Sequence, residues 1–179
     1  MVYLPREDSY LLREWVERLA KGNVLDMGTG TGIQAFAALP TAKKVVAVDA
    51  NPEAIDYAKN AIIFGEKQVE FRVSDLFSAI KKDEKFDIII FNPPYLPEAP
   101  YDKEIDVTGG KHGWETIEKF LKQAKTYLTS NGKILMVFSS HTDKEKVLSI
   151  AKGMGYKAKM LDKKHLSFED IFVYEFVRG

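Results

Sequence analysis

A stretch at positions 86–91, apolar except for Asp87, leads directly into Asn92, Pro93, Pro94 and Tyr95, the residues of this chain best suited to chemistry. Asn92 offers a side-chain carbonyl oxygen, and Pro93 offers a backbone carbonyl whose direction the prolines fix. Two such acceptors could hold both N–H bonds of a planar amide or amine and aim its nitrogen at a reaction partner. Tyr95 adds an aromatic face for a planar group. The alternative is a turn that only ends a strand.

The run at 86–91 predicts where these residues lie. Its side chains suit a strand that is buried on both faces, as in a parallel sheet. The strand must stop at Pro93, because prolines cannot donate hydrogen bonds to a neighbouring strand. Ligands bind to open α/β sheets just beyond the carboxyl ends of central strands. Asn92 and Tyr95 are therefore candidate site residues.

A second candidate group surrounds a glycine loop. Asp26 is followed by Gly28, Gly30 and Gly32 between a predicted strand and a predicted helix. Glycines at such a turn let the backbone approach a ligand closely. The spacing differs from the G-x-G-x-x-G fingerprint of dinucleotide-binding proteins, and no P-loop lysine follows. Taken alone, such a loop is weak evidence for a ligand site, and a purely structural turn is the alternative.

Two further acids follow the next two predicted strands. Asp49 ends its strand 21 residues after Gly28, where a carboxylate can accept hydrogen bonds from ribose hydroxyls and would repel a 2′-phosphate. Asp75 could accept from the exocyclic amine of an adenine, with Leu76 packed on the ring. Each acid could instead cap the helix that follows it.

The elements that position these residues alternate between helix and strand. Strands are expected at 23–27, 44–49, 68–73, 86–91, 133–138, 156–162 and 168–177, and helices after 8, 32, 51, 113 and 142. Asp8 or Ser9 is expected to cap the first helix, and Asn131-Gly132 to turn into the fifth strand. The alternation predicts an α/β three-layer sandwich with parallel strands and an antiparallel final hairpin.

The amino-acid composition argues against several classes of function. The chain has 179 residues, enough for a single domain over 1–179, and Lys plus Arg equals Asp plus Glu at 26 each. This neutral balance argues against a broad nucleic-acid surface. With no cysteine and three histidines, a structural metal site is not expected. No signal or membrane-spanning stretch is present, so the expected location is cytoplasmic.

The order of first acid, glycine loop and two further acids resembles class I S-adenosylmethionine-dependent methyltransferases. This resemblance implies a seven-stranded sheet of order 3-2-1-4-5-7-6 and S-adenosyl-L-methionine as methyl donor, with S-adenosyl-L-homocysteine as product and no metal. It places Asp26 and the glycines beside the amino-acid part of the cofactor. Asp49 would then bind the ribose, and Asp75 and Leu76 the adenine, while Asn92 would lie against both cofactor and substrate.

The N-terminal segment 3–12 resembles the Tyr-x-Pro-x-Glu-Asp-Thr-x-x-Leu opening of release-factor glutamine methyltransferases of the archaeal and eukaryotic type. Ser9 stands where that family has threonine and keeps a hydroxyl for the cofactor carboxylate. Gly109-Gly110-Lys111-His112-Gly113 resembles the family's Gly-Gly-x-x-Gly loop. The implied reaction is N5-methylation of the Gly-Gly-Gln glutamine of a class I release factor, with Asn92, Pro93, Pro94 and Tyr95 binding that substrate.

Three other functions remain open at this level. The Asn-Pro-Pro-Tyr motif also occurs in N6-adenine methyltransferases acting on RNA or DNA, against which the neutral charge argues. A non-catalytic nucleotide-binding module and an NAD-dependent oxidoreductase fit the motifs less well. Lys111 and His112, in the long loop 96–113, are expected to face solvent rather than to act in catalysis.

The resemblance also implies a partner. The family uses a small zinc-binding activator protein that pairs with the third strand. Gln68–Val73 alternates apolar and polar residues, which is typical of an edge strand open to such pairing. Ile62, Ile63 and Phe64 could add an apolar patch. Alternatively, the charged side chains of Glu70 and Arg72 protect this edge from pairing with another strand.

Overall fold

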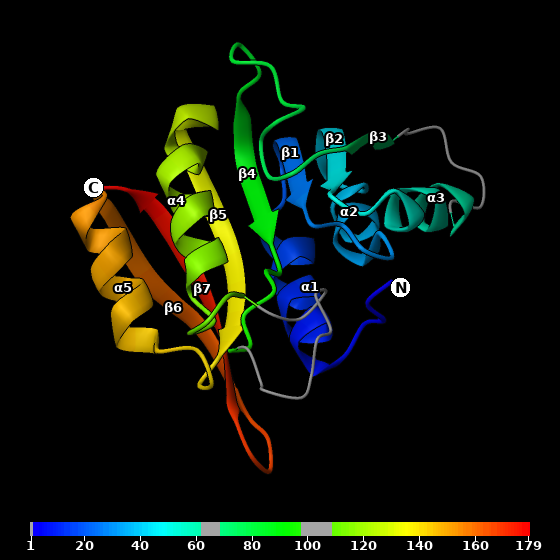
Figure 1. Ribbon diagram of the computed structural model, residues 1–179. Coiled ribbons are helices and arrows are strands. Elements are labelled where there is room, and N and C mark those ends of the chain that lie inside the picture. The colour runs from blue at the N-terminus through cyan, green and yellow to red at the C-terminus, as the bar shows by residue number, and fades with distance from the viewer. Residues whose placement is uncertain (1, 62–68, 98–108) are drawn as a thin grey trace.

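The computed structural model describes residues 2–61, 69–97 and 109–179. Five helices and seven strands lie within these ranges (Figure 1). The helices are α1 (Glu7–Leu19), α2 (Ile33–Ala38), α3 (Pro52–Ala61), α4 (Glu115–Tyr127) and α5 (Lys144–Gly153). The strands are β1 (Gly22–Met27), β2 (Ala42–Asp49), β3 (Val69–Val73), β4 (Phe86–Phe91), β5 (Leu128–Ser139), β6 (Tyr156–His165) and β7 (Asp170–Arg178).

All seven strands belong to one sheet of order β3-β2-β1-β4-β5-β7-β6, which confirms the predicted fold class. Strands β1 to β5 are mutually parallel, and β7 runs antiparallel to both β5 and β6. The strand β4 is central, and its apolar side chains are buried as the sequence predicts. The strand order reverses between β1 and β4, whose carboxyl ends therefore flank a ligand-binding crevice.

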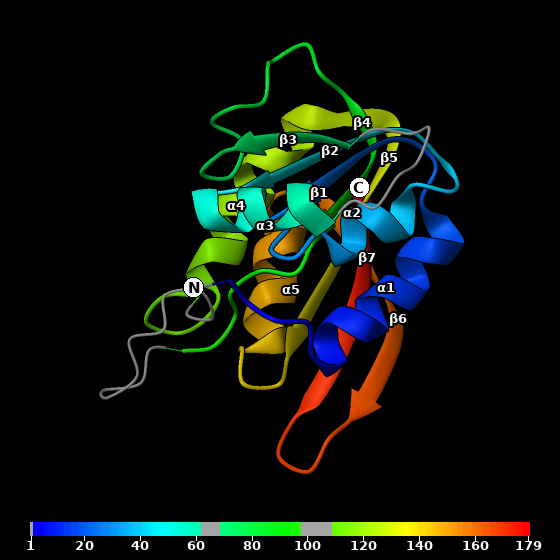
Figure 2. The ribbon, with the colours of Figure 1, turned by 90° about the vertical axis from the view of Figure 1, so that its right-hand side faces the viewer.

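Helices cover both faces of this sheet, as Figures 1 and 2 show. Alternate residues of β4 point to opposite faces, which gives the sheet two cores. Ile89 and Phe91 pack in the core beneath α4 and α5, whereas Ile88 and Ile90 pack in the core beneath α1 and α2. This three-layer arrangement fixes β4, and with it the residues that follow, from both sides. None of the described helices has the length and apolar character needed to span a membrane.

Several boundaries differ from the sequence-based expectation. The helix α1 already begins at Glu7, so Asp8 and Ser9 lie inside its first turn and neither is its N-cap. The strand β5 starts at Leu128 and passes through Asn131-Gly132 in an irregular register against β4, so these residues form no separate turn. The hairpin of β6 and β7 is longer than expected and projects beyond the sheet (Figure 1). The patch 62–64 and Gln68, the first residue of the expected third strand, lie outside the described residues.

Candidate active site

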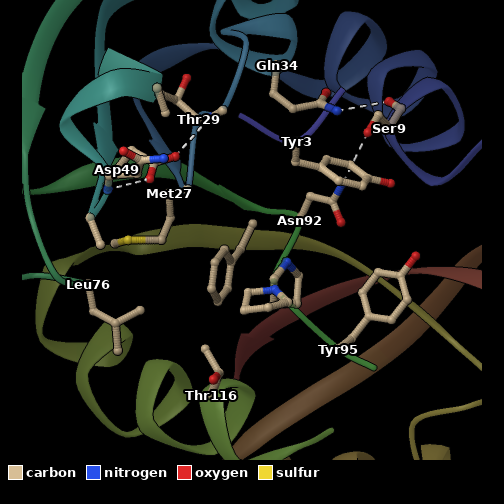
Figure 3. Close-up of a pocket in the computed structure, with 18 of the residues that line it drawn as sticks. Tyr3, Ser9, Met27, Thr29, Gln34, Asp49, Leu76, Asn92, Tyr95 and Thr116 are labelled. Atoms are coloured by element: carbon tan, nitrogen blue, oxygen red, sulfur yellow. Dashed lines mark hydrogen bonds between the residues drawn. The ribbon is translucent and has the colours of Figure 1, made fainter. Parts of the chain in front are cut away.

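A cavity of about 1140 Å³ opens at the carboxyl ends of β1, β2 and β4. Most of the predicted site residues line it, and Figure 3 shows several of them facing one another across the space. The lining includes Ser9, Gly28, Gly30, Asp49, Asp75, Leu76, Asn92, Pro93, Pro94 and Tyr95. The fold therefore brings together residues that lie more than 80 positions apart in the chain. Asp26 and Gly32 are not among the lining residues.

The glycine loop passes under one side of this cavity. Gly28, Gly30 and Gly32 all have positive φ angles, of 64°, 53° and 86°, which other residues adopt only with strain. At Gly32 a Cβ atom would also lie 2.7 Å from the ring of Phe36. The positive φ angles therefore determine the shape of this loop. At Gly28 and Gly30 the loop backbone itself lines the cavity.

The buried side chain of Asp26 holds the glycine loop through hydrogen bonds. Its side chain is 1% exposed, and its Oδ2 accepts hydrogen bonds from the Thr29 hydroxyl at 2.7 Å and the Ala35 amide at 3.0 Å. Burial raises the pKa of this carboxyl to about 7, although the two hydrogen bonds oppose the rise. Asp26 therefore joins the loop to the first turn of α2.

Asp49 stands at the end of β2, beside the same loop. Its Oδ2 accepts from the Gly30 amide and its Oδ1 from the Asn51 amide, each at 2.9 Å. A carboxylate has about four acceptor sites, so Asp49 keeps acceptor capacity toward the cavity that it lines. The side chain thus fixes the loop and can still bind a hydroxyl.

Asp75 and Leu76 follow β3 in a strained turn. Leu76 has a φ of 46°, which for a branched side chain is an outlier that needs support from its surroundings. Ser74 provides that support, because its hydroxyl donates to the Leu76 carbonyl at 2.6 Å and accepts from the Ala79 amide at 2.9 Å. The turn places the Leu76 side chain at the cavity wall (Figure 3).

The opposite wall is built around the carboxylate of Asp8. This buried side chain accepts hydrogen bonds from the Tyr3 hydroxyl at 3.0 Å, the Tyr95 hydroxyl at 3.0 Å and the Asn92 Nδ2 at 3.1 Å. Ser9 contributes its amide to the same carboxylate at 2.6 Å, and its hydroxyl accepts from Asn92 Nδ2 at 3.2 Å. Sequence analysis expected a helix cap at Asp8 and missed this role.

The two tyrosines of this cluster are held as neutral donors. Burial, followed by the neighbouring charge of Asp8, raises the pKa of both the Tyr3 and the Tyr95 hydroxyl far above its ordinary value of 10.0. Both hydroxyls therefore keep their protons at any physiological pH. Tyr95 can act here as a donor and as an aromatic surface, not as a base.

Gln34 is a cavity residue that the sequence analysis did not single out. Its side chain is 3% exposed, and its Nε2 donates to the Ser9 carbonyl at 2.9 Å, as Figure 3 shows. Its Oε1 is buried and has no hydrogen-bond partner within the described part of the chain. A buried amide oxygen without a donor is costly unless a ligand satisfies it. In the sequence, Gln34 is the polar residue of the otherwise apolar stretch 33–38, and this pattern could have identified it as a candidate.

The Gly-Gly-x-x-Gly loop packs against the backbone of Pro94, Tyr95 and Leu96. The Gly109 amide donates to the Leu96 carbonyl at 2.9 Å, and Thr142 Oγ1 donates to the Tyr95 carbonyl at 2.5 Å. Lys111 and His112 are exposed, and His112 Nδ1 lies 2.7 Å from Glu115 Oε1, outside the cavity. The expectation that these two side chains face solvent is confirmed.

Comparison with known proteins places the chain in a family. The model of the family described as "Methyltransferase small domain" matches residues 7–165, which include α1, the glycine loop and β4. The chain belongs to this family. It is an enzyme of the S-adenosylmethionine-dependent methyltransferase class, and the predicted resemblance is confirmed.

Individual relatives resemble the chain over most of its length. A Methanocaldococcus jannaschii protein named as a protein N5-glutamine methyltransferase is 36% identical, covering 96% of this chain and 89% of that relative. Human methyltransferase HEMK2 is 26% identical, covering 99% of this chain and 90% of its own length. The release factor glutamine methyltransferase of Koribacter versatilis is 40% identical over 75% of this chain, but over only 54% of its own length. The chain thus spans about half of such bacterial relatives.

Solved structures confirm the fold. The E. cuniculi Mtq2 protein, described in complex with Trm112 and as responsible for methylation of the eRF1 translation termination factor, superposes with a TM-score of 0.82 at 24% identity. That match covers 99% of both chains. A methyltransferase from Pyrococcus furiosus gives a TM-score of 0.70 at 26% identity, covering 97% of this chain and 86% of that one.

Proposed function

We propose that this enzyme transfers the methyl group of S-adenosyl-L-methionine to the side-chain amide nitrogen, N5, of the Gly-Gly-Gln glutamine in a class I peptide chain release factor. The observation that carries the proposal is the orientation of Asn92. Both donor positions of its amide are engaged, by Asp8 and Ser9, so its Oδ1 is the group left to accept from a substrate. The names of the archaeal and bacterial relatives support the glutamine acceptor.

The residues present fit the cofactor. The glycine backbone and the Ser9 hydroxyl would lie along its amino-acid part, and the unpartnered Oε1 of Gln34 would accept from its ammonium group. Asp49 would accept from the ribose hydroxyls, and Asp75 with Leu76 would bind the adenine. When bound, the cofactor supplies an electrophilic methyl on a sulfonium leaving group, becomes S-adenosyl-L-homocysteine, and needs no metal for this transfer.

The chain's own contribution to the reaction is positioning. An amide nitrogen is a poor nucleophile because its lone pair is delocalised, and its N–H groups are too weakly acidic for a base to help much. Asn92 Oδ1 and the Pro93 carbonyl would each accept one N–H of the glutamine amide and so fix its plane. As the N–CH₃ bond forms and the S–CH₃ bond breaks, the nitrogen becomes strongly acidic, and one of these two protons would leave along the hydrogen bond that holds it and pass to solvent. Tyr95 would offer its ring face to that amide.

Adenine N6 is the competing acceptor, because it is also a planar NH₂ group. The net charge of zero provides no broad attraction for a phosphate backbone. The relatives' names favour a protein substrate as well. A release factor acceptor also implies a cytoplasmic location, where translation terminates.

We further propose that a small zinc-binding activator protein pairs with the free edge of β3. This strand is at the end of the sheet, so one side of its backbone is unpaired within the described sheet. The Trm112 subunit in the E. cuniculi complex supports a partner of this kind. Ion pairs of Arg72 with Glu70 and Glu84 occupy the side chains of this edge but leave its backbone groups available.

Transfer of a labelled methyl group tests the proposal. The enzyme, alone and with the cognate activator, is incubated with labelled cofactor and one acceptor at a time: wild-type release factor, a factor whose Gly-Gly-Gln glutamine is changed to glutamate, tRNA, rRNA or DNA. Label is expected in the wild-type factor only, at the glutamine side chain by mass spectrometry. Label in tRNA, rRNA or DNA and none in the factor would overturn the proposed acceptor in favour of adenine.

A further inference from the structure

The carboxylate of Asp8 holds the Asn92 side chain from a distant part of the chain. The Asn92 Nδ2 lies 3.1 Å from Asp8 Oδ2, a contact between residues 84 positions apart. Tyr95 donates to the same oxygen at 3.0 Å. Asp8 is 2% exposed, so these hydrogen bonds form away from water, where bonds to a charged acceptor are strong.

The contact with the Asp8 carboxylate allows only one orientation of the Asn92 side-chain amide. Ionised carboxylate oxygens only accept hydrogen bonds, so the NH₂ end of Asn92 must face Asp8. The second proton of this NH₂ group is directed to the Ser9 hydroxyl at 3.2 Å. The amide oxygen of Asn92 is then turned away from Ser9, as Figure 3 shows. Among the described residues no donor is bonded to that oxygen.

We propose that Asp8 is the positioning residue that selects the amide orientation of Asn92 and presents its Oδ1 as an acceptor to the substrate. The consequence for catalysis rests on the proposed glutamine methylation. The orientation itself does not, because it follows from the contacts of Asp8 alone. An Asn92 turned by half a rotation would present NH₂ to a substrate NH₂ and could not hold it.

The substitution Asp8→Asn tests this selection without removing volume. The Ser9 amide donates to Asp8 Oδ1 at 2.6 Å and cannot turn, so an asparagine at this position keeps its oxygen there. Its NH₂ group would then face Asn92 Nδ2, and Asn92 is expected to turn over to relieve the contact between donors. The expected kinetic result is a fall in kcat of about 100-fold, with the affinity for S-adenosyl-L-methionine, measured by calorimetry, within about threefold of wild type.

A matched control separates this effect from loosening of α1. Asp162 also binds this helix through a carboxylate, since the Trp15 Nε1 donates to its Oδ2 at 3.0 Å, but it lies outside the cavity. Asp162→Asn is expected to lower thermal stability without changing kcat by more than about twofold. Equal losses of kcat in the two variants would mean that α1 packing, and not Asn92, explains the effect.

The orientation can also be measured in the wild-type protein without any substrate. We expect a through-hydrogen-bond NMR coupling between the Asn92 side-chain nitrogen and the Asp8 carboxyl carbon, and its loss in Asp8→Asn together with a shift of the Asn92 NH₂ resonances. Absence of the coupling in wild type, or unchanged resonances in the variant, would overturn the inference even if release factor is the true substrate. Resonances that move while kcat stays at the wild-type value would overturn the catalytic role.

Discussion

The two walls of the cavity are built differently. On one wall, here called the cofactor wall after its proposed ligand, amides of the glycine loop donate to β2: the Gly30 amide to the Asp49 side chain and the Thr29 amide to the Val48 carbonyl. On the acceptor wall side chains bond to side chains across 83 to 87 positions of sequence, around Asp8. The contacts of the first wall lie within one β-α-β unit, whereas those of the second form only once α1 has packed against α2 and β5 and so brought Asp8 to the residues that follow β4.

This difference predicts separate consequences of mutation. Changes to the cofactor wall should alter cofactor affinity, because that wall is present whether or not a substrate binds. Changes to Asp8, Asn92 or Tyr95 on the acceptor wall should alter turnover at saturating cofactor, because these side chains are the ones proposed to orient the nucleophile. Variants that mix the two effects would show that the walls are coupled.

Asn92→Ala should have the largest effect. It removes the Oδ1 acceptor for the substrate amide, so kcat should fall by about 1000-fold, by analogy with the loss of a positioned hydrogen-bonding group in other enzymes. The affinity for S-adenosyl-L-methionine should change by less than about threefold. Methyl transfer at saturating cofactor and isothermal calorimetry measure the two quantities. A comparable loss of cofactor affinity would mean that Asn92 belongs to both walls.

Asp49→Ala should have the reverse profile. It removes a carboxylate that anchors the Gly30 and Asn51 amides and faces the cavity, so cofactor affinity should fall by about 10- to 100-fold. At saturating cofactor, kcat should stay within about fivefold of wild type. Asp49→Asn is the matched variant, because it can still accept from one amide, and its loss should be smaller. A normal cofactor Kd in Asp49→Ala would contradict the assignment of this residue.

The same difference explains what the sequence could and could not reveal. The strand β4 and the position of Asn92 were predictable, because an apolar run that ends in prolines has few other structures available to it. Asp49 and the glycine loop were predictable from their spacing within one β-α-β unit. These features depend on residues that are close together in the chain.

Features that depend on tertiary contacts were not predictable in this way. An acid before a helical pattern is most simply a cap, and only the packing of α1 reveals that Asp8 instead binds Asn92 and Tyr95. The left-handed backbone of Leu76 requires the Ser74 side chain to close the turn, which no local propensity favours. Asn131-Gly132 reads as a turn, but pairing with β4 draws it into β5.

A substitution at Gln34 tests whether the cofactor wall includes this residue of α2. Gln34→Met keeps the side-chain length but removes the unpartnered Oε1, together with the Nε2 donor to the Ser9 carbonyl, so cofactor affinity should fall by about tenfold. The affinity for 5′-methylthioadenosine, which lacks the amino-acid part of the cofactor, should be unchanged, because Oε1 is proposed to bind the ammonium group. Calorimetry with both ligands measures this. Equal losses for the two ligands would show that the substitution disturbs the loop in general.

Substitution of Asp26 should give the smallest effect, a change in the stability of the folded protein alone. Its carboxyl has a pKa of about 7 in the folded protein against an ordinary value of 3.8. Between these two values the folded state keeps a proton that the unfolded state has released, so raising the pH favours unfolding. The stability linked to this proton is complete below about pH 4 and is lost as the pH rises through 7. The shift corresponds to a few kcal/mol at most.

Asp26→Asn removes this titration but keeps an oxygen to accept from Thr29 and the Ala35 amide. The Tm of wild type minus that of the variant should therefore fall steadily from pH 4 to pH 7.5, as measured by calorimetric melts. Asp83→Asn, on the exposed surface, is the matched control for the loss of one carboxyl. A difference that rises over the same range would mean that the buried carboxylate is charged in the fold. Asp26 would then contribute a negative charge beneath the glycine loop, and the cofactor wall would act through charge as well as through backbone shape.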